Sequence, residues 1–229
     1  MMKTNEELKR DVIDELNWEP TVIDGIVTPN NNFKIEVSVV NGVVTLDGEV
    51  DSYAKKWSAY RAVRRIVGVK EVVDNTKVKL PDYFKLADEE IRREALHAIE
   101  LNVSIPHDRV DVKVLNGSLT LTGEVDWAYQ REAAKEIIYH LKGVGWVDDQ
   151  ITIKPVEPVD LKAKIESAFR RNALVDSNRI GVEIQGGEVI LRGSVQSWAE
   201  KEEALRIVWA ARGVSQIDDH ILINSLAEA

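Results

Sequence analysis

The chain lacks cysteine, has only three phenylalanines and shows no excess of positive charge. Without cysteine among its 229 residues, it can form no disulfide, thiol nucleophile or zinc–cysteine site. Its 39 acidic residues outnumber its 30 basic residues and give a formal net charge of −9. Because binding to a phosphate backbone requires a dense positive field, nucleic acid is not an expected partner.

Long apolar runs are also missing from the sequence. No stretch approaches the roughly 18 consecutive apolar residues of a membrane-spanning helix, so we expect no transmembrane segment. The first ten residues turn charged at once and contain no apolar centre of an export signal. As written, the chain is expected in the cytoplasm, and a periplasmic location is the alternative if the sequence is a mature form.

Glycine is the residue whose placement is most informative. Nine of the 13 glycines form three triples, in which the second and third members follow the first by 6 and 26 positions. A fixed internal period of this kind indicates a tandem array of one small module, which is more typical of a binding protein than of an enzyme. The triples are Gly42, Gly48 and Gly68; Gly117, Gly123 and Gly143; and Gly187, Gly193 and Gly213.

Each module is predicted to begin with an amphipathic helix. Thr4 and Glu7 have the spacing of a capping box at the start of the first one. Apolar residues then recur at i, i+4 and i+8, which places them on one helix face that turns toward a core. They are Leu8, Val12 and Leu16; Ile91, Ala95 and Ile99; and Leu161, Ile165 and Phe169.

A β-hairpin is predicted after this helix in each module. Its two turn residues accept positive φ, as a type I′ turn requires. A two-residue loop then places Val37 opposite Leu46 and Ile35 opposite Gly48, so that one sheet face is apolar and the other is mostly wet. The turn dipeptides are Asn41-Gly42, Asn116-Gly117 and Gly186-Gly187.

The middle glycine of each triple lies on the apolar face of the second strand. Glycine weakens a strand unless another group approaches closely. Gly48, Gly123 and Gly193 are therefore interpreted as the places where a second helix lies on the sheet. The expected N-caps of this helix are Asp51, Asp126 and Ser197, and the last glycine of each triple ends it in a Schellman motif.

A third strand closes each module, at residues 76–80, 151–153 and 221–223. The order helix–strand–strand–helix–strand, with one apolar sheet face, predicts an α+β fold. We expect three tandem two-layer sandwiches, each a small mixed sheet with two helices on one face.

Proline-containing linkers near residues 81 and 155–158 divide the chain. The predicted modules are 1–82, 83–157 and 158–229. The first is longer than the others by 8 residues from helix to hairpin. These extra residues are placed in a loop within 18–32, which is either a functional loop or a tolerated insertion.

Side chains capable of chemistry are scattered through these modules. Asp148-Asp149 and Asp218-Asp219 are expected in the turn before the third strand, where aspartate is an ordinary residue. Gly186-Gly187 belongs to a hairpin and not to a phosphate loop. We predict no catalytic residue, no metal site, no cofactor and no enzymatic activity. The four histidines form no i, i+4 ligand pair; they are His97, His107, His140 and His220.

The repeated pattern resembles the BON domain, named after bacterial osmotically induced periplasmic proteins and nodulation proteins. The first module has Ile35-x-Val37-x-Val39-Val40-Asn41-Gly42, followed by Val-Val-Thr-Leu46-x-Gly48-x-Val50 and later by Gly68-Val69. Residues 112–125 and 182–195 repeat the same pattern. The resemblance implies a non-catalytic module, often in tandem, that associates with phospholipid or other envelope components in osmotic and general stress responses. The matched residues are structural, so the resemblance implies no site residue.

Tryptophan is the one unusual residue type, with six copies. Rings beside basic side chains suit a membrane interface or a polymer-binding surface. Packing between modules or subunits, and incidental exposure, are the alternatives. The candidate binding residues are Trp57, Lys55, Lys56, Arg61, Arg64, Arg65, Trp127 and Trp198.

The sequence therefore predicts a non-catalytic binding or scaffold protein of three BON-like modules. Its expected partner is a phospholipid or membrane surface, with the basic residues of the second helix of the first module in electrostatic contact. The alternative is a cytoplasmic protein–protein interaction or assembly module with no lipid role. The sequence leaves the oligomeric state open.

Overall fold

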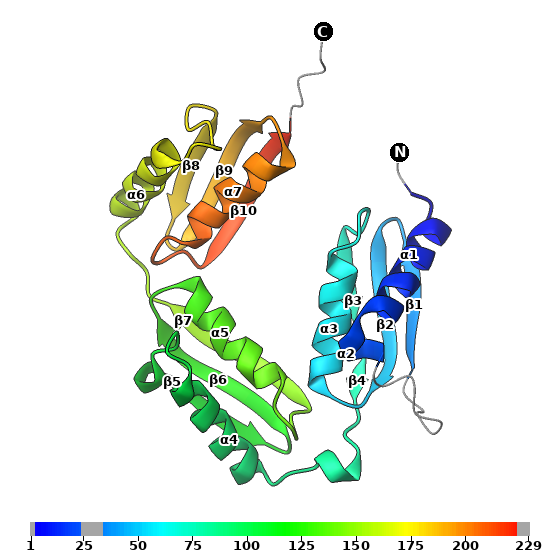
Figure 1. Cartoon of the computed structure of the whole chain (residues 1–229). Coiled ribbons are helices and arrows are strands. Elements are labelled where there is room, and N and C mark those ends of the chain that lie inside the picture. Colours follow the sequence, from blue (N-terminus) through cyan, green and yellow to red (C-terminus); the bar gives the residue numbers. More distant parts are fainter. Residues whose placement is uncertain (1–2, 24–33, 224–229) are drawn as a thin grey trace. The chain divides into compact units, whose positions relative to one another are not determined.

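The computed structural model describes residues 3–23 and 34–223, and these form three small α+β modules in tandem (Figure 1). In each module two helices cover one face of a sheet, as the sequence predicts. The elements of the first module are α1 (Asn5–Trp18), α2 (Pro20–Ile23), β1 (Ile35–Val40), β2 (Val43–Val50), α3 (Tyr53–Arg64), β3 (Glu71–Asp74) and β4 (Lys77–Val78).

The second and third modules follow the same order. A short 3-10 helix, η1 (Asp82–Phe84), leads into the second module. The second module contains α4 (Asp88–Leu101), η2 (His107–Arg109), β5 (Val110–Leu115), β6 (Ser118–Val125), α5 (Ala128–Tyr139) and β7 (Trp146–Ile153). The third module contains α6 (Pro158–Arg171), β8 (Ile180–Gln185), β9 (Glu188–Val195), α7 (Trp198–Trp209) and β10 (Gln216–Ile223).

The sheets are small, and each is built around its second strand. The strand orders are β1-β2-β3 with β4 also on β2, β5-β6-β7, and β10-β9-β8. In the first sheet β1 pairs antiparallel and β3 pairs parallel with β2. In the third sheet β8 pairs antiparallel and β10 pairs parallel with β9. The first and third sheets are therefore mixed.

By its internal contacts the chain forms two compact units, and the second module is shared between them. Unit 1 comprises Met1–Ala98, Val112–Thr120 and Glu136–Asp148. Unit 2 comprises Ile99–Asp111, Leu121–Lys135 and Asp149–Ala229.

The predicted register of the first and third hairpins is confirmed, and so are the buried faces of the first helices. Val37 pairs with Leu46 and Ile35 with Gly48, and the hairpin of the third module has the equivalent pairing. All nine apolar residues predicted on the first helices are at most 6% exposed. Side chains from both helices thus cover the apolar face of each sheet and form the core of its module.

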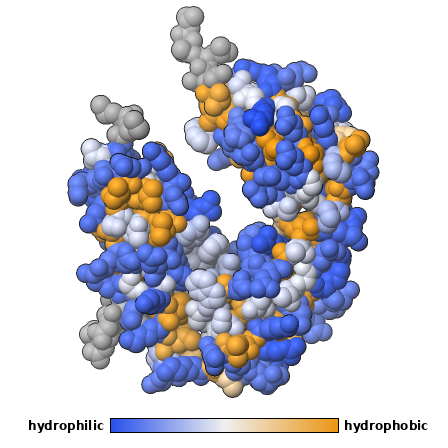
Figure 2. Space-filling view, turned by 180° about the vertical axis from the view of Figure 1, so that it is seen from behind, coloured by the Kyte–Doolittle hydropathy of each residue, from blue (hydrophilic) through white to orange (hydrophobic). Residues whose placement is uncertain are grey.

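The outer sheet face is less uniformly polar than expected. Figure 2, which views the molecule from behind, shows hydrophobic patches among the hydrophilic residues. Along β1 half-buried and exposed side chains alternate. Val40, the last residue of the strand, is 62% exposed. Leu115 ends β5 and is 72% exposed. Burial on one face only, as in other antiparallel hairpins, leaves these residues in water.

Close approach of a helix does not explain the strand glycines, so that interpretation was wrong. Gly48, Gly123 and Gly193 have φ of 115°, 136° and 135°. A Cβ at any of them would overlap a backbone carbonyl oxygen from the start of the partner strand, not a helix. Glycine is required because the strand bends there with a backbone conformation that side chains do not tolerate.

The third hairpin turn also differs from the prediction. Asn41 and Gly42 have φ of 53° and 86°, which agrees with a type I′ turn. In the turn of the third module Gly186 has a positive φ of 62°, whereas Gly187 does not. A positive φ at the first central position alone is the pattern of a type II′ turn. Both turns suit the twist of a hairpin, so the strand register is the same.

One of the three expected N-caps of the second helices was wrong. The Ser52 hydroxyl, and not Asp51, accepts a hydrogen bond from the Lys55 amide at the start of α3. The Asp126 carboxylate accepts hydrogen bonds from two arginines, and its capping of α5 stays a prediction. Ser197 caps α7 as expected.

The third strands are longer than the sequence suggested. β7 and β10 begin at Trp146 and Gln216, so the aspartate pairs at 148–149 and 218–219 lie within strands and not in turns. In the first module Pro20–Ile23 of the predicted 18–32 loop is a short helix. The rest of that loop, from residue 24 on, lies outside the described residues.

Candidate functional site

The basic residues predicted on α3 fall into buried and exposed groups. Lys56 is only 6% exposed. Its ammonium lies 3.0 Å from the Asp74 carboxylate and donates to the carbonyl and hydroxyl oxygens of Thr76. Lys56 therefore fixes α3 to the third strand and offers no charge to a ligand.

This ion pair recurs in all three modules. Arg131 lies 2.7 Å from Asp149, and Lys201 lies 2.8 Å from Asp219. In each pair the base follows the strand glycine by 8 positions and the acid follows it by 26. Each aspartate also accepts a hydrogen bond from the amide two residues later. The sequence analysis missed this pair, although its repeated offsets were present in the sequence.

Trp57 belongs to an aromatic cluster within unit 1. Its ring stacks on Tyr60 with a centroid distance of 5.5 Å and lies 4.6 Å from the ring of Tyr139. Tyr53 lies 5.2 Å from Tyr139 and meets Trp146 edge-on at 6.4 Å. Thus α3 contacts the end of α5 and the start of β7 through side chains, which is the module packing considered from the sequence.

Burial in this cluster changes the chemistry of two polar groups. It raises the pKa of Tyr53 to about 12, with a further contribution from the nearby Asp74 charge. The indole Nε1 of Trp57 is buried without a hydrogen-bond partner. Such a group costs about 1–3 kcal/mol. The ring contacts with Tyr60 and Tyr139 must offset this cost.

The arginines at the end of α3 lie on the surface. Arg61 binds Glu136 at 2.9 Å, and Arg65 binds Glu19 at 2.9 Å and Glu15 at 3.3 Å. The guanidinium of Arg64 lies 5.7 Å from the centroid of the Tyr60 ring.

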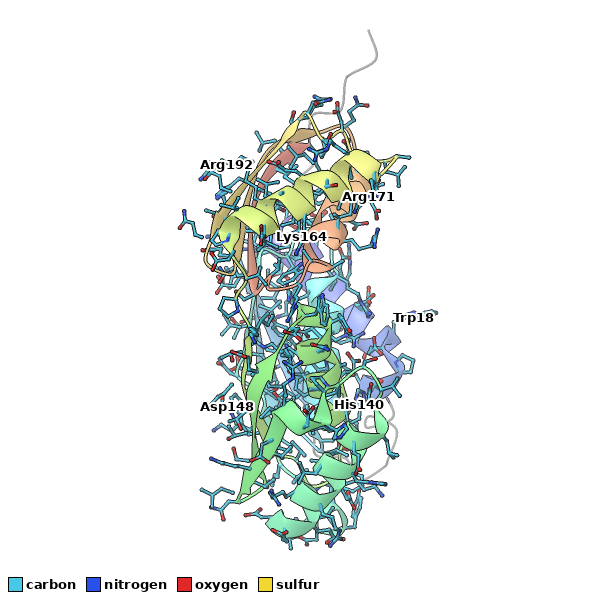
Figure 3. All side chains as sticks on the ribbon, turned by 90° about the vertical axis from the view of Figure 1, so that its left-hand side faces the viewer. Trp18, His140, Asp148, Lys164, Arg171 and Arg192 are labelled. Carbon is cyan, nitrogen blue, oxygen red and sulfur yellow. The ribbon has the colours of Figure 1, made fainter. Side chains whose placement is uncertain are left out.

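Trp18 is the last residue of α1. It is 81% exposed, and its side chain points away from the ribbon (Figure 3). Glu15 lies three residues before Trp18 and Glu19 directly follows it. Both bind Arg65, so this arginine lies next to the last turn of α1. We call Trp18, Arg65 and the chain neighbour of Arg65, Arg64, the Trp18 surface. The sequence analysis missed Trp18 because it lies at the edge of the predicted loop.

Asp126 and Trp127 lie together at a contact within unit 2. Asp126 accepts hydrogen bonds from Arg109 at 2.9 Å and from Arg212 at 2.7 Å, which lower its pKa. The Arg212 guanidinium also lies 5.6 Å from the centroid of a Trp127 ring. The amide of Gly213 donates to the Asp126 carbonyl at 3.0 Å. The start of α5 thus contacts the end of α7.

The remaining predicted residues differ in accessibility. The Lys55 side chain is 15% exposed and lies 2.6 Å from Asp51. Trp198 is 68% exposed, with the Lys201 ammonium 5.7 Å from its ring centroid. Trp198 is therefore accessible, whereas Lys55 is held in an ion pair.

A cavity of about 610 Å³ lies at the end of the first module. Its apolar lining comes from Leu8, Val67 and Val69, and its basic lining from Lys3 and Lys70. Val67 is 79% exposed beside it. The cavity thus offers apolar contacts next to two ammonium groups.

Within residues 3–23 and 34–223, histidine and carboxylate side chains are spread over several helices and strands. In these ranges no three His, Cys, Asp or Glu side chains come together as a metal site. All four histidines are exposed; the His220 ring lies 2.8 Å from Asp218, and the His140 ring lies 2.8 Å from the Glu136 carbonyl. Within the same ranges, the helices are too short or too polar to span a bilayer.

Comparison with known proteins identifies the repeated fold. The family model of the BON domain matches residues 4–79, 87–155 and 159–225. Osmotically-inducible protein Y of Escherichia coli (strain K12) is 24% identical over 158 residues, which cover 65% of this chain and 78% of that protein.

Solved structures of CdsD, described as a structural protein of the type III secretion system of Chlamydia trachomatis, also align with the chain. One is 14% identical with a TM-score of 0.27 and covers 94% of this chain and 91% of its own. The other, of the C-terminal domain, has the same identity and TM-score and covers 97% and 100%. These scores are too low to support an argument. The three family matches, which together span most of the sequence, show that the chain belongs to the BON-domain family.

Proposed function

We propose that this protein is a non-catalytic binding protein that associates with phospholipid at a membrane surface as part of a stress response. The family match and the similarity to an osmotically inducible protein support the stress-related and membrane-associated parts of the proposal. The observation that supports a specific contact is the exposed Trp18, which directly precedes Glu19, the ion-pair partner of Arg65.

The Trp18 surface has the two chemistries that a membrane interface requires. An indole ring has an apolar body and a polar N–H, and such rings settle at the level of lipid headgroups. Arginine binds phosphate with a planar, permanently charged group. Trp18 would enter the interface while the arginines contact headgroup phosphates.

The other predicted residues take different parts in the proposal. Arg61 adds positive charge near the Trp18 surface. Lys56, Trp57 and Trp127 are structural in our account because their side chains contact other parts of the chain. The module limits 1–82, 83–157 and 158–229 remain our proposal.

Vesicle sedimentation tests the membrane contact. The protein should bind phosphatidylglycerol vesicles at low salt and phosphatidylcholine vesicles much less, and added salt should weaken binding. Arg64→Gln should weaken binding about fivefold, because a basic residue near an anionic surface contributes about 1 kcal/mol. Trp18→Ala should also weaken it.

The matched control is Trp209→Ala, which removes a 41% exposed tryptophan from the third module. It should leave vesicle binding unchanged. Absence of binding to anionic vesicles at low salt would refute the function. Equal losses in Trp209→Ala and Trp18→Ala would refute the proposed contact.

A second candidate function, protein assembly, is favoured by a different observation. Trp198 is 68% exposed at the start of α7, although tyrosine at the equivalent start of α3 is 9% exposed and in contact with another module. This difference indicates an unoccupied contact surface on the third module.

A further inference from the structure

The two contacts between successive modules have the same direction along the chain. Within unit 1, Tyr53 at the start of α3 contacts Tyr139 at the end of α5. Within unit 2, Trp127 just before α5 contacts Arg212 just after α7. In both cases the start of the second helix of one module contacts the end of the second helix of the next.

Each module therefore has two different contact surfaces. We call the surface at the beginning of the second helix, which includes Tyr53 or Trp127, the start side. We call the surface at the end of that helix, which includes Tyr139 or Arg212, the end side. The second module uses its end side toward the first module and its start side toward the third. A contact between two different surfaces is heterologous, so it can be repeated from one copy to the next. Among residues 3–23 and 34–223, Trp198 on the start side of the third module is 68% exposed, and a cavity lies on the end side of the first.

The start side of the third module is exposed at the position where the first module is covered. Trp198 and Tyr53 each follow their strand glycine by five positions. Tyr53 is 9% exposed because Tyr139 and Trp146 lie against it, whereas Trp198 is 68% exposed. In the first module, the large ring at this position, Tyr53, is buried at the contact with the second module.

The end side of the first module has the cavity that such a ring could enter. Val67-Gly68 is equivalent to Arg212-Gly213, which contacts the second module. The cavity of about 610 Å³ lies at this place and is lined by Leu8, Val67 and Val69.

The cavity exists because the first module lacks an apolar residue that the other two have. A Cβ on Gly143 would lie 3.2 Å from Leu86, and one on Gly213 would lie 2.8 Å from Val156. Both residues precede the first core residue of their helix by five positions, and Lys3 occupies this position in the first module. The Lys3 ammonium lies 2.6 Å from Asp11, so its charge is paired on the helix surface.

We propose that the protein self-associates head to tail, with Trp198 of one chain in the end-side cavity of the first module of a second copy. This proposal rests on the assembly function named above and specifies its partner. Charges on the two sides are complementary, since the exposed acidic Glu202 lies one turn after Trp198 and the basic Lys70 lines the cavity. Asp126 and Arg212 have the same order, with the acid on the start side and the base on the end side.

Analytical ultracentrifugation from about 1 µM to about 1 mM tests the proposal, since this range detects weak association. The wild-type chain should increase in mass with concentration. Trp198→Ala should remain a monomer because it lacks the start side. Val67→Asp should remain a monomer because it places a charge at the end-side cavity.

An equimolar mixture of the two variants provides the decisive result. Trp198→Ala retains the end side and Val67→Asp retains the start side, so together they should form a complex of two chains and no larger species. Trp18→Ala is the matched control; it alters the proposed lipid contact and should self-associate like the wild type. Circular dichroism melts should show that all variants are folded.

A wild-type chain that is monomeric throughout the range would overturn the proposal. So would self-association that persists in either folded single variant, or a mixture that stays monomeric. Vesicle binding by Trp198→Ala would be retained in all of these cases if the membrane proposal holds, so the two proposals can fail separately.

Discussion

Replacing a strand glycine by alanine should destabilise its module more than any other single-methyl addition that we consider. Gly193 has a φ of 135°, and a Cβ there would overlap the carbonyl oxygen of Arg179. The third module provides two matched controls. Gly186 has a φ of 62° with nothing within 4 Å of an added Cβ, and Gly181 has an ordinary φ with its nearest atom 3.6 Å away.

The geometry gives a ranked set of magnitudes. Gly193→Ala combines a forbidden backbone conformation, about 1–3 kcal/mol, with displacement of packed neighbours, about another 1–3 kcal/mol. The total of about 2–6 kcal/mol is a large part of the roughly 4–10 kcal/mol expected for a module of about 70 residues. Gly186→Ala should cost about 1–2 kcal/mol. Gly181→Ala should be neutral or stabilise by up to about 1 kcal/mol.

Hydrogen exchange with mass spectrometry in increasing urea can measure these effects in the full chain, because it reports on each module separately. Amides of β8 and β9 should lose protection at the lowest urea concentration in Gly193→Ala, next in Gly186→Ala and last in Gly181→Ala. If Gly193→Ala retained the protection of Gly181→Ala, the explanation of the strand glycines would be refuted.

Three further predictions concern charge and pH. Lys56→Met should lower the free energy of urea unfolding by about 3–5 kcal/mol, because it leaves its buried carboxylate partner unpaired. Arg61→Met on the surface should lower it by less than about 1 kcal/mol. Equal losses in the two variants would contradict this prediction. Since the folded protein raises the pKa of Tyr53 to about 12, the stability that comes from burying the neutral phenol should fall as pH rises from about 10 to about 12. An absorbance difference titration of the wild type against Tyr53→Phe should find this pKa. An ordinary pKa near 10 would disprove the burial. The hydrogen bond from Arg206 lowers the pKa of Glu203 to about 2. The stability that the ionised Glu203 contributes is therefore present above about pH 4.5 and is lost as pH falls toward 2. Thermal melts of Glu203→Gln should lack this contribution, and a variant with the same dependence of stability on acid pH as the wild type would argue against it.

Local features of each module could be predicted from sequence because the residues that determine them are close together. A turn dipeptide such as Asn41-Gly42 sets the hairpin loop length, and strand alternation then sets the register. The stripe from Leu8 to Leu16 likewise identifies a helix and its buried face. The repeat made these predictions stronger because the same local pattern occurred three times.

Features that depend on contacts between distant residues could not be predicted in the same way. The need for Gly48 arises from a carbonyl of the partner strand, which the sequence pattern does not reveal. The contacts of Trp57 and Tyr53 with Tyr139 depend on how modules pack. The ion pair of Lys56 with Asp74 could have been found, because base and acid recur at the same offsets in each module.

The candidate site illustrates the same division. Basic and aromatic residues crowd the sequence of α3, and this density suggested one binding surface. Lys56 and Trp57 instead point into contacts within the chain, while Trp18 is the exposed ring nearby. Exposure depends on tertiary structure, so composition alone identified the region but not all of its residues.

Fluorescence quenching by vesicles with brominated acyl chains tests the central claim most directly, because quenching requires a tryptophan ring at the membrane interface. With anionic brominated vesicles at low salt, wild-type fluorescence should be quenched. Trp18→Phe, which keeps the other five tryptophans, should lose most of that quenching. No quenching of the wild type, or equal quenching of both proteins, would contradict the membrane contact that we propose.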